Sequence, residues 1–205
     1  MKLYDFPRSS ASFRVRIALN LKGCQYETVK VDFATGDQMA PSYRQVNPSG
    51  LVPFVEFDDG VRLSQSMAIM KYLDRLYPSP RLLPENVADE AAVMEMAMTI
   101  ACDIHPLNNL RVLKYLEQEL GADEAARQAW YANWVRAGFS GLEALVAARS
   151  GGARCFGDEL TAVDVCLVPQ MFNARRFSVP LDDFSTLVEI DRVLQDIPAF
   201  RDAAP

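Results

Sequence analysis

The sequence predicts an α/β domain followed by an all-helical domain, and two observations support this prediction. Strand and helix patterns alternate as β-α-β and then β-β-α up to about residue 76, and only helical periodicity follows. Between the two parts, Tyr77-Pro78-Ser79-Pro80 and Pro84 form a segment that cannot continue a helix. We therefore assign residues 1–78 to the first domain, 79–86 to a linker and 87–205 to the second domain.

The first predicted elements are a strand over residues 3–6 and a helix over about 12–22. Apolar residues recur every four positions in the helix and predict its buried face. Gly23 follows, at a position where a left-handed residue commonly ends a helix. The basic residues of this helix are predicted to face solvent: Arg14, Arg16 and Lys22.

The rest of the first domain is predicted to contain three more strands and one helix, and the polar stretch 34–45 is predicted to be a loop with room for one short helix. Strands are expected over residues 28–33, 52–57 and 61–63, with Asp59-Gly60 as a hairpin turn. The segment 64–66 is expected to open a helix that runs to Leu76 and turns Ile69, Leu73 and Leu76 inward. This order requires a parallel strand pair with a crossover and then an antiparallel hairpin. The predicted domain is therefore a mixed four-stranded sheet with helices, the thioredoxin-like arrangement.

Helical patterns fill the second domain, with a break at Pro106 and glycines at two of the predicted helix ends. Thr161 and Asp164 have capping-box spacing before an apolar run, although Asp is shorter than the usual Glu. The helix that follows is apolar nearly all round, so we expect it at the centre of this domain. The predicted helices cover residues 90–104, 107–120, 123–149, 162–176 and 187–194.

Composition excludes several functional classes. The net charge is −6 and no Lys/Arg-rich block is present, which argues against nucleic acid and anionic membranes as partners. No apolar run approaches the length of a membrane span, and no secretory signal is visible. The four cysteines are scattered without a C-x-x-C motif, as in a cytoplasmic protein with reduced thiols. A single histidine argues against a multi-histidine metal site.

The stretch Arg8–Leu19 is the most informative in the chain, because three serines lie between the first strand and the first helix. Serine caps helix N-termini, and the positive end of a helix favours an anion such as a thiolate. The chain has no cysteine there, so a reactive sulfur would have to come from a ligand. The alternative interpretation is an ordinary capped helix.

These motifs together resemble the glutathione transferase family. Arg8–Leu19 is similar to the zeta-class pattern of two serines before an Arg-Val-Arg-Ile-Ala-Leu run. Asn47-Pro48, Val52-Pro53 and the segment 65–69 match the family's glutathione-binding motifs. Three further segments match the linker and the maleylpyruvate isomerase branch, whose pattern maleylacetoacetate isomerases largely share: 81–84, 103–109 and 168–177.

The resemblance implies a set of glutathione contacts in the first domain. Ser9 would donate a hydrogen bond to the glutathione sulfur, and Ser10 with the Ala11 backbone would complete the pocket. Ala11 replaces the family's cysteine, which disfavours disulfide exchange at this site. The remaining contacts implied here are the backbone of Val52 at a cis bond to Pro53, a helix start at Gln65 and Ser66 for the γ-glutamyl carboxylate, and Gln38 for the glycyl end. Capping and strand-edge roles remain the alternatives.

In the second domain the resemblance implies that His105 and Asn108 contact glutathione or substrate. It also implies that Arg8 and Arg176 bind the carboxylates of the substrate, because guanidinium groups suit planar anions. The alternative is that both are surface arginines, and for Arg175 we prefer that interpretation.

The implied function is a cytoplasmic, glutathione-dependent cis–trans isomerase of a small unsaturated keto acid, either maleylpyruvate or maleylacetoacetate. Addition of the thiolate would leave a single bond that can rotate, and elimination would release the trans isomer. No metal is implied, and the family suggests a homodimer. The alternatives are a general glutathione transferase or dehalogenase and a non-catalytic binding protein on the same fold.

Overall fold

The computed structural model describes residues 1–205, and the chain forms two compact units. The first unit consists of Met1–Leu82 together with Pro198–Pro205, and the second consists of Leu83–Ile197. The C-terminal segment thus groups with the first unit, whereas the sequence analysis assigned it to the second domain.

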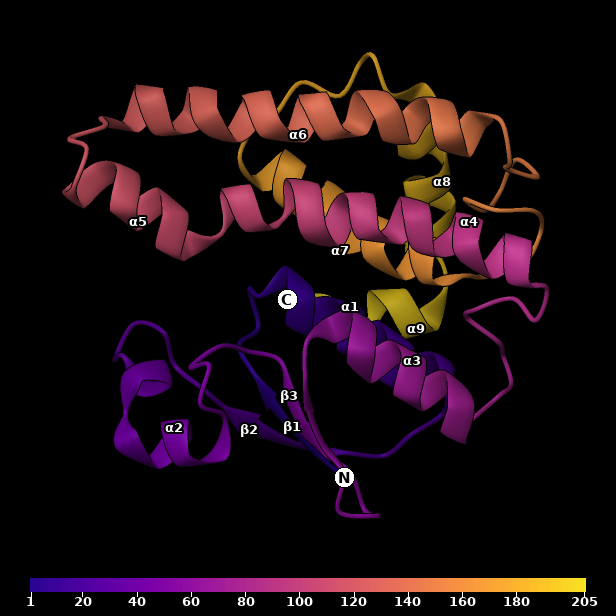
Figure 1. Cartoon of the computed structure of the whole chain (residues 1–205). Helices are drawn as coiled ribbons and strands as arrows, with labels where there is room; N and C mark the ends of the chain where they lie inside the picture. The colour runs from indigo at the N-terminus through magenta and orange to yellow at the C-terminus, as the bar shows by residue number, and fades with distance from the viewer. The chain divides into compact units, whose positions relative to one another are not determined.

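The first unit is a mixed four-stranded sheet with helices (Figure 1). The strand order is β2-β1-β3-β4; β1 and β2 are parallel, and the other two pairs are antiparallel. This confirms the predicted thioredoxin-like arrangement. The main elements are β1 (Lys2–Asp5), α1 (Ser10–Leu21), β2 (Glu27–Lys30), β3 (Phe54–Glu56), β4 (Arg62–Ser64) and α3 (Ser66–Leu76).

Three short helices complete the first unit. The connection from β2 to β3 contains the 3-10 helix η1 (Asp37–Met39) and α2 (Pro41–Val46). The sequence did not predict α9 (Pro198–Arg201), which packs against α1. Asn20 Nδ2 donates to the Ala199 carbonyl at 3.1 Å, which ties this late segment to α1.

The strand register brings four loops to one edge of the sheet. Tyr4 in β1 pairs with Phe54 in β3, and Phe54 pairs with Ser64 in β4. Because β3 is antiparallel to both neighbours, the residues before Phe54 lie at the same edge as those after Asp5 and Ser64. The parallel pairing of Asp5 with Lys30 brings the chain after β2 to this edge as well.

The prediction that the basic residues of α1 face solvent is wrong. Arg14, Arg16 and Lys22 are only 1, 8 and 9% exposed. Arg16 Nη1 donates to Asp5 at 2.8 Å, and Lys22 Nζ donates to Asp74 Oδ1 at 2.7 Å. A prediction from helical periodicity places every charged residue in solvent. In the structure both α3 and α9 pack against α1, so its charged residues are covered as well.

The prediction is also wrong for Leu76, which is 43% exposed, because α3 ends there and the last turn no longer lies on the core. Ile69 and Leu73 are fully buried as predicted.

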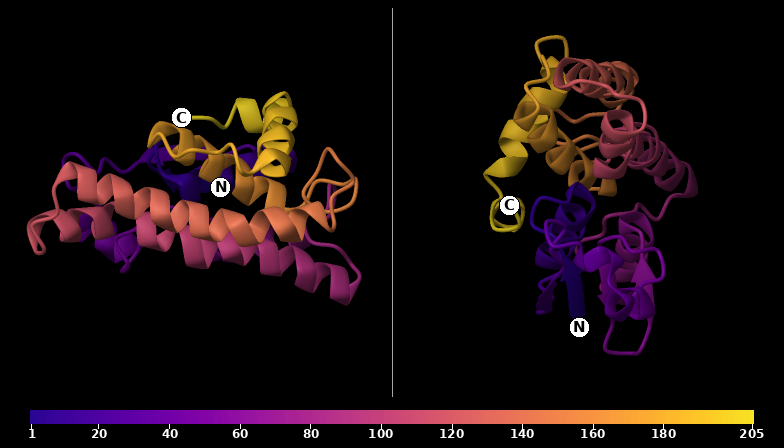
Figure 2. Two further views of the ribbon diagram at one scale, coloured as in Figure 1. Left: turned by 90° about the horizontal axis from the view of Figure 1, so that it is seen from above. Right: turned by 90° about the vertical axis from the view of Figure 1, so that its left-hand side faces the viewer.

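The second unit is all helical, as predicted, and Figure 2 shows α6 running the length of this unit beside the chain of α4 and α5. The single helix predicted over residues 90–104 is in fact two segments: α4 ends at Met98, and a π-helical segment follows it. Nearly all of α7 is buried, and the capping box at Thr161 and Asp164 is present. The elements are α4 (Val87–Met98), η2 (Thr99–Ile104), η3 (Pro106–Asn108), α5 (Leu110–Gln118), α6 (Glu124–Ala147), α7 (Ala162–Arg176) and α8 (Ser185–Gln195). None of the helices combines the length and apolar composition needed to cross a bilayer.

Candidate functional site

Ser9 is the N-cap of α1. Its Oγ accepts a hydrogen bond from the Ser12 backbone N–H at 3.2 Å, and its own N–H donates to the Phe6 carbonyl. A hydroxyl that accepts in this way still has its own proton to donate. The cap and the implied bond to a sulfur are therefore compatible, and the two interpretations of this stretch do not compete.

The start of α1 is electropositive. Its first turn contains no acidic residue, so no side chain of that turn offsets the partial positive charge of the helix N-terminus. Ser10 is buried, Ala11 is half-buried and Arg8 is exposed just before the cap. An anionic sulfur would therefore be stabilised here more than a neutral thiol.

The peptide bond between Val52 and Pro53 is cis. The loop that leads to it is held by two donors to the Leu51 carbonyl, Tyr43 Oη at 2.6 Å and Asn47 Nδ2 at 2.7 Å. Asn47 is buried, so the Asn-Pro motif found in the sequence has a structural role in this loop. Sequence reasoning missed Tyr43, whose contact depends on the fold.

Gln38 lies beside this same loop. A Cβ at Gly50 would come within 2.8 Å of the Gln38 carbonyl oxygen, and Gly50 has a positive φ of 62°. Glycine therefore permits the close approach of the two segments. The side-chain Oε1 of Gln38 is buried and has no hydrogen-bond partner, which leaves an acceptor for a ligand N–H.

Gln65 and Ser66 form the start of α3. Gln65 is the N-cap, with a φ of 72° that is uncommon for a residue other than glycine. Such strain often occurs at functional sites. The first turn of α3 contains no acidic residue, and Ser66 is buried at the first helical position.

Arg14 is the residue of this region that sequence reasoning missed. It is 1% exposed, and its Nη1 donates to Ser66 Oγ at 3.3 Å. Its Nε and Nη2 are buried without a hydrogen-bond partner. The only available signal was the Arg-Val-Arg run itself, in which amphipathic patterning assigned both arginines to solvent.

In the second unit, His105 and Asn108 lie at a break between helices. His105 follows the π-helical segment η2, and Asn108 ends the 3-10 helix η3. Single π-helical turns are frequent at functional sites. Asn108 is 8% exposed and donates from Nδ2 to the Tyr131 carbonyl at 3.5 Å, while its Oδ1 is buried without a partner.

Tyr131 connects this break to the end of α7. Its ring stacks on Phe177 with centroids 4.0 Å apart and an interplanar angle of 19°. The Arg176 guanidinium lies 5.3 Å from the Phe177 ring centroid, a cation–π distance. Burial raises the pKa of Tyr131, and the nearby Arg176 opposes this shift.

Arg175 and Arg176 are neighbours in α7 with different surroundings. Arg175 donates to the fully buried carboxylate of Asp191, whereas Arg176 is exposed and has no carboxylate within salt-bridge distance. Arg175 is thus exposed, as we interpreted it, but its charge is paired within the protein, whereas the charge of Arg176 is available to a ligand.

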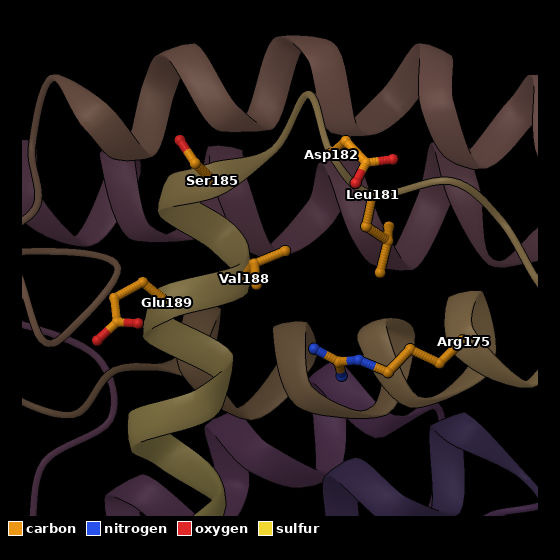
Figure 3. Close-up of a pocket in the computed structure, with 6 residues that line it drawn as sticks. All are labelled: Arg175, Leu181, Asp182, Ser185, Val188 and Glu189. Carbon is orange, nitrogen blue, oxygen red and sulfur yellow. The ribbon is translucent and has the colours of Figure 1, made fainter.

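Figure 3 shows the side chain of Arg175 extending toward α8, across a surface cavity of about 350 Å³ in the second unit. The cavity is open and combines one arginine with two carboxylates, which makes it a poor receptor for an anion. Its lining residues are Arg175, Leu181, Asp182, Ser185, Val188 and Glu189.

Each unit thus groups its own predicted residues. At one edge of the first unit's sheet lie the segments carrying Ser9, Ser10, Ala11, Gln38, Val52, Pro53, Gln65 and Ser66. In the second unit, Asn108 and Arg176 are linked through Tyr131 and Phe177. No three His, Cys, Asp or Glu side chains form a group that could hold a metal ion.

The residues of the first unit fit glutathione, a peptide with a thiol and two carboxylates. Two helix starts without acidic residues can hold anions, and the buried Gln38 Oε1 can accept from an amide. The unpartnered nitrogens of Arg14 add a positive charge near Ser66.

Comparison with known proteins agrees with this assignment. Residues 1–75 match the glutathione S-transferase N-terminal domain. The chain is 45% identical over 205 residues to a probable maleylacetoacetate isomerase of Vibrio cholerae, covering 99% of this chain and 94% of the relative.

Solved structures of similar proteins also cover the whole chain, among them the following two. One is the holo structure of a maleylpyruvate isomerase, a bacterial zeta-class glutathione transferase. It has a TM-score of 0.96 and 43% identity, and 97% of it is covered. The other is a maleylacetoacetate isomerase from Methylobacterium extorquens AM1 with bound malonate and glutathione. It has a TM-score of 0.92 and 34% identity, and 100% of it is covered. Identity of this level over the full length confirms the resemblance seen in the motifs, and the chain belongs to the zeta-class glutathione transferase family, in its maleylpyruvate and maleylacetoacetate isomerase branch.

Proposed function

We propose that the protein is a glutathione-dependent cis–trans isomerase of a small unsaturated keto acid that carries carboxylates. The observation that supports this most is the start of α1, where the Ser9 hydroxyl caps the helix and keeps a proton to donate. When bound, glutathione supplies the thiolate that adds to the substrate double bond and leaves again after rotation.

The chain's own residues prepare this chemistry in the first unit. Ser9 donates to the sulfur, and the start of α1 favours its anionic form because no acidic side chain of the first turn opposes it. The Val52 backbone and Gln38 hold the peptide part, and Ser66 at the start of α3 holds the γ-glutamyl carboxylate.

Recognition of the substrate requires cations that the protein has not already neutralised. Arg176 in the second unit meets this requirement, since no carboxylate lies within salt-bridge distance of its guanidinium. Arg8 in the first unit is exposed just before Ser9. We assign each of them to a substrate carboxylate, and His105 and Asn108 to contacts with glutathione or substrate.

We also propose a cytoplasmic homodimer. Four free cysteines suit a reducing compartment. The α5 helix has no buried residue, and Leu110, Tyr115 and Leu120 in and after it are 46, 60 and 65% exposed. Such apolar exposure is typical of an interaction surface, and light scattering of the purified protein would measure the oligomeric state.

The decisive experiment follows the loss of maleylpyruvate and of maleylacetoacetate by ultraviolet absorbance, with and without glutathione. We expect conversion that depends strictly on glutathione while total glutathione stays constant. Ser9→Ala should reduce kcat by roughly a hundredfold, whereas Ser42→Ala, at an exposed position of α2, should not change it. Consumption of glutathione would instead indicate a conjugating transferase, and full activity of Ser9→Ala would overturn the assigned role.

A further inference from the structure

The α1 helix and its C-cap residue Lys22 bury three cations, and only two of them have a carboxylate partner. Arg16 pairs with Asp5 at 2.8 Å, and Lys22 pairs with Asp74 at 2.7 Å. Arg14 is the most deeply buried of the three, and its one hydrogen bond goes to the neutral hydroxyl of Ser66 at 3.3 Å.

A buried charge without a counter-charge is strongly unfavourable, so buried cations in proteins are normally paired. Arg14 has two further buried nitrogens, Nε and Nη2, with no hydrogen-bond partner. Its positive charge is therefore not offset by a carboxylate within salt-bridge distance, and an anionic ligand near Ser66 would offset it.

The position of Ser66 indicates which anion this is. Ser66 is at the first helical position of α3, whose first turn has no acidic residue and whose N-cap Gln65 is strained. Backbone N–H groups at such a helix start bind a carboxylate, and a nearby cation strengthens the binding. We propose that Arg14 is a positioning residue that orients Ser66 and supplies the buried counter-charge for the α-carboxylate of the γ-glutamyl residue of glutathione. This inference rests on the proposed function, because it takes glutathione as the ligand of the first unit.

The proposal predicts opposite effects on stability and on binding. Without ligand, the unpaired charge of Arg14 should destabilise the first unit, and ligand binding should remove that penalty. Arg14→Met preserves most of the side-chain volume and removes the charge. The unliganded variant should therefore unfold at a temperature no lower than the wild type, while its affinity for glutathione falls by about tenfold or more.

Calorimetric titration with two ligands tests this directly. The first is glutathione, and the second is γ-aminobutyryl-cysteinyl-glycine, which lacks only the α-carboxylate in question. In the wild type, loss of this carboxylate should weaken binding strongly; in Arg14→Met, the same loss should weaken it at least tenfold less, since the two groups are coupled. Arg14→Lys, which keeps the charge, should restore part of the difference, and Arg14→Gln serves as a second neutral variant if the methionine variant fails to fold.

Arg75→Met is the matched control, because Arg75 is an exposed cation near the C-terminal end of α3, the helix that begins at Ser66. It should show the wild-type ratio of the two affinities. The proposal is overturned if the ratio of the two affinities in the neutral Arg14 variants equals the wild-type ratio, whether both affinities are unchanged or both fall by the same factor. Neither readout depends on turnover, so a wild type that binds glutathione but isomerises neither substrate would refute the proposed function and leave the Arg14 inference open to this same test.

Discussion

The two units differ in how their buried charges are satisfied, because the second unit buries two partnered carboxylates and the first unit buries one arginine without a carboxylate partner. In the second unit, the fully buried Asp164 accepts from the Cys155 and Thr161 N–H groups and from the Thr161 hydroxyl. Asp191, also fully buried, accepts from Arg175 and Gln195. In the first unit, the guanidinium of Arg14 has a single neutral partner.

This difference separates structural charges from functional ones. A buried charge whose partners all lie within the protein holds elements together; Asp164, for example, joins the start of α7 to the loop before it. A charge without such partners is available to a ligand, which is how we interpret Arg14 in the first unit and Arg176 in the second. Four predictions test the distinction.

The largest expected effect is on a fully partnered charge. Asp164→Ala leaves three donors around it without their acceptor, so we expect a loss of about 3–5 kcal/mol in the free energy of unfolding. Urea unfolding of the purified protein measures it. Asp182→Ala, at an exposed position of the same unit, is the control and should change stability by less than about 0.5 kcal/mol. A similar loss in both variants would contradict the comparison.

Adjacent arginines of α7 should separate stability from substrate binding. Arg176→Met should raise KM for the maleyl substrate by about tenfold without changing the melting temperature, because it removes a cation that has no protein carboxylate partner. Arg175→Met should leave KM unchanged and destabilise by about 1–2 kcal/mol, since the buried Asp191 loses a partner while Arg175 itself is partly exposed. Equal effects of the two changes on KM would show that the pairing with Asp191 does not distinguish them.

The pH dependence of the free energy of unfolding should reveal the cost of burying the ionised Asp191 carboxylate. Burial raises the pKa of this carboxyl, so the folded protein retains its proton at a higher pH than the unfolded chain does. Stability from this group therefore rises as the pH falls through the raised pKa toward the unfolded value, by at most about 1.4 kcal/mol per pH unit.

Asp191→Asn lacks this titration. The stability of the wild type relative to the variant should increase between pH 7 and pH 4, as measured by denaturant unfolding at each pH. A difference that stays constant, or that decreases toward acid pH, would refute the shift.

The smallest effect should come from a change at Phe177, whose ring contacts the Arg176 guanidinium. Phe177→Leu removes the stacking on Tyr131 and the ring below the guanidinium, which together contribute about 1 kcal/mol. We expect KM for the substrate to rise about threefold to fivefold, with no change in glutathione affinity by calorimetry. Weaker glutathione binding would show that this stack also supports the other ligand.

Local sequence patterns predicted most of the fold. The alternation of strands and helices gave the mixed sheet, and the helix over 162–176 was predicted with its observed bounds because a capping box starts it and its apolar residues are continuous. The serines before α1 indicated the candidate site in the same way, since capping depends only on neighbouring residues.

The missed features depend on residues distant in the chain. Arg16 and Lys22 are buried because Asp5 and Asp74 neutralise them, and no local pattern shows such pairing. The positive φ of Gln65 was also missed, because only the surrounding structure imposes it. Arg14 was missed for two reasons. Its burial results from the packing of α1 against α3, and two of its buried nitrogens have no hydrogen-bond partner within the protein.

The segment Pro198–Pro205 has a consequence for how the protein is made. It belongs to the first unit, and its Ala203 carbonyl accepts from Nε of the buried Arg16 at 2.8 Å. The ribosome synthesises this segment only after the whole of Leu83–Ile197. The half of the protein that is translated first is thus completed last, and a fragment that stops at Leu82 lacks one of the acceptors that its own buried arginine requires.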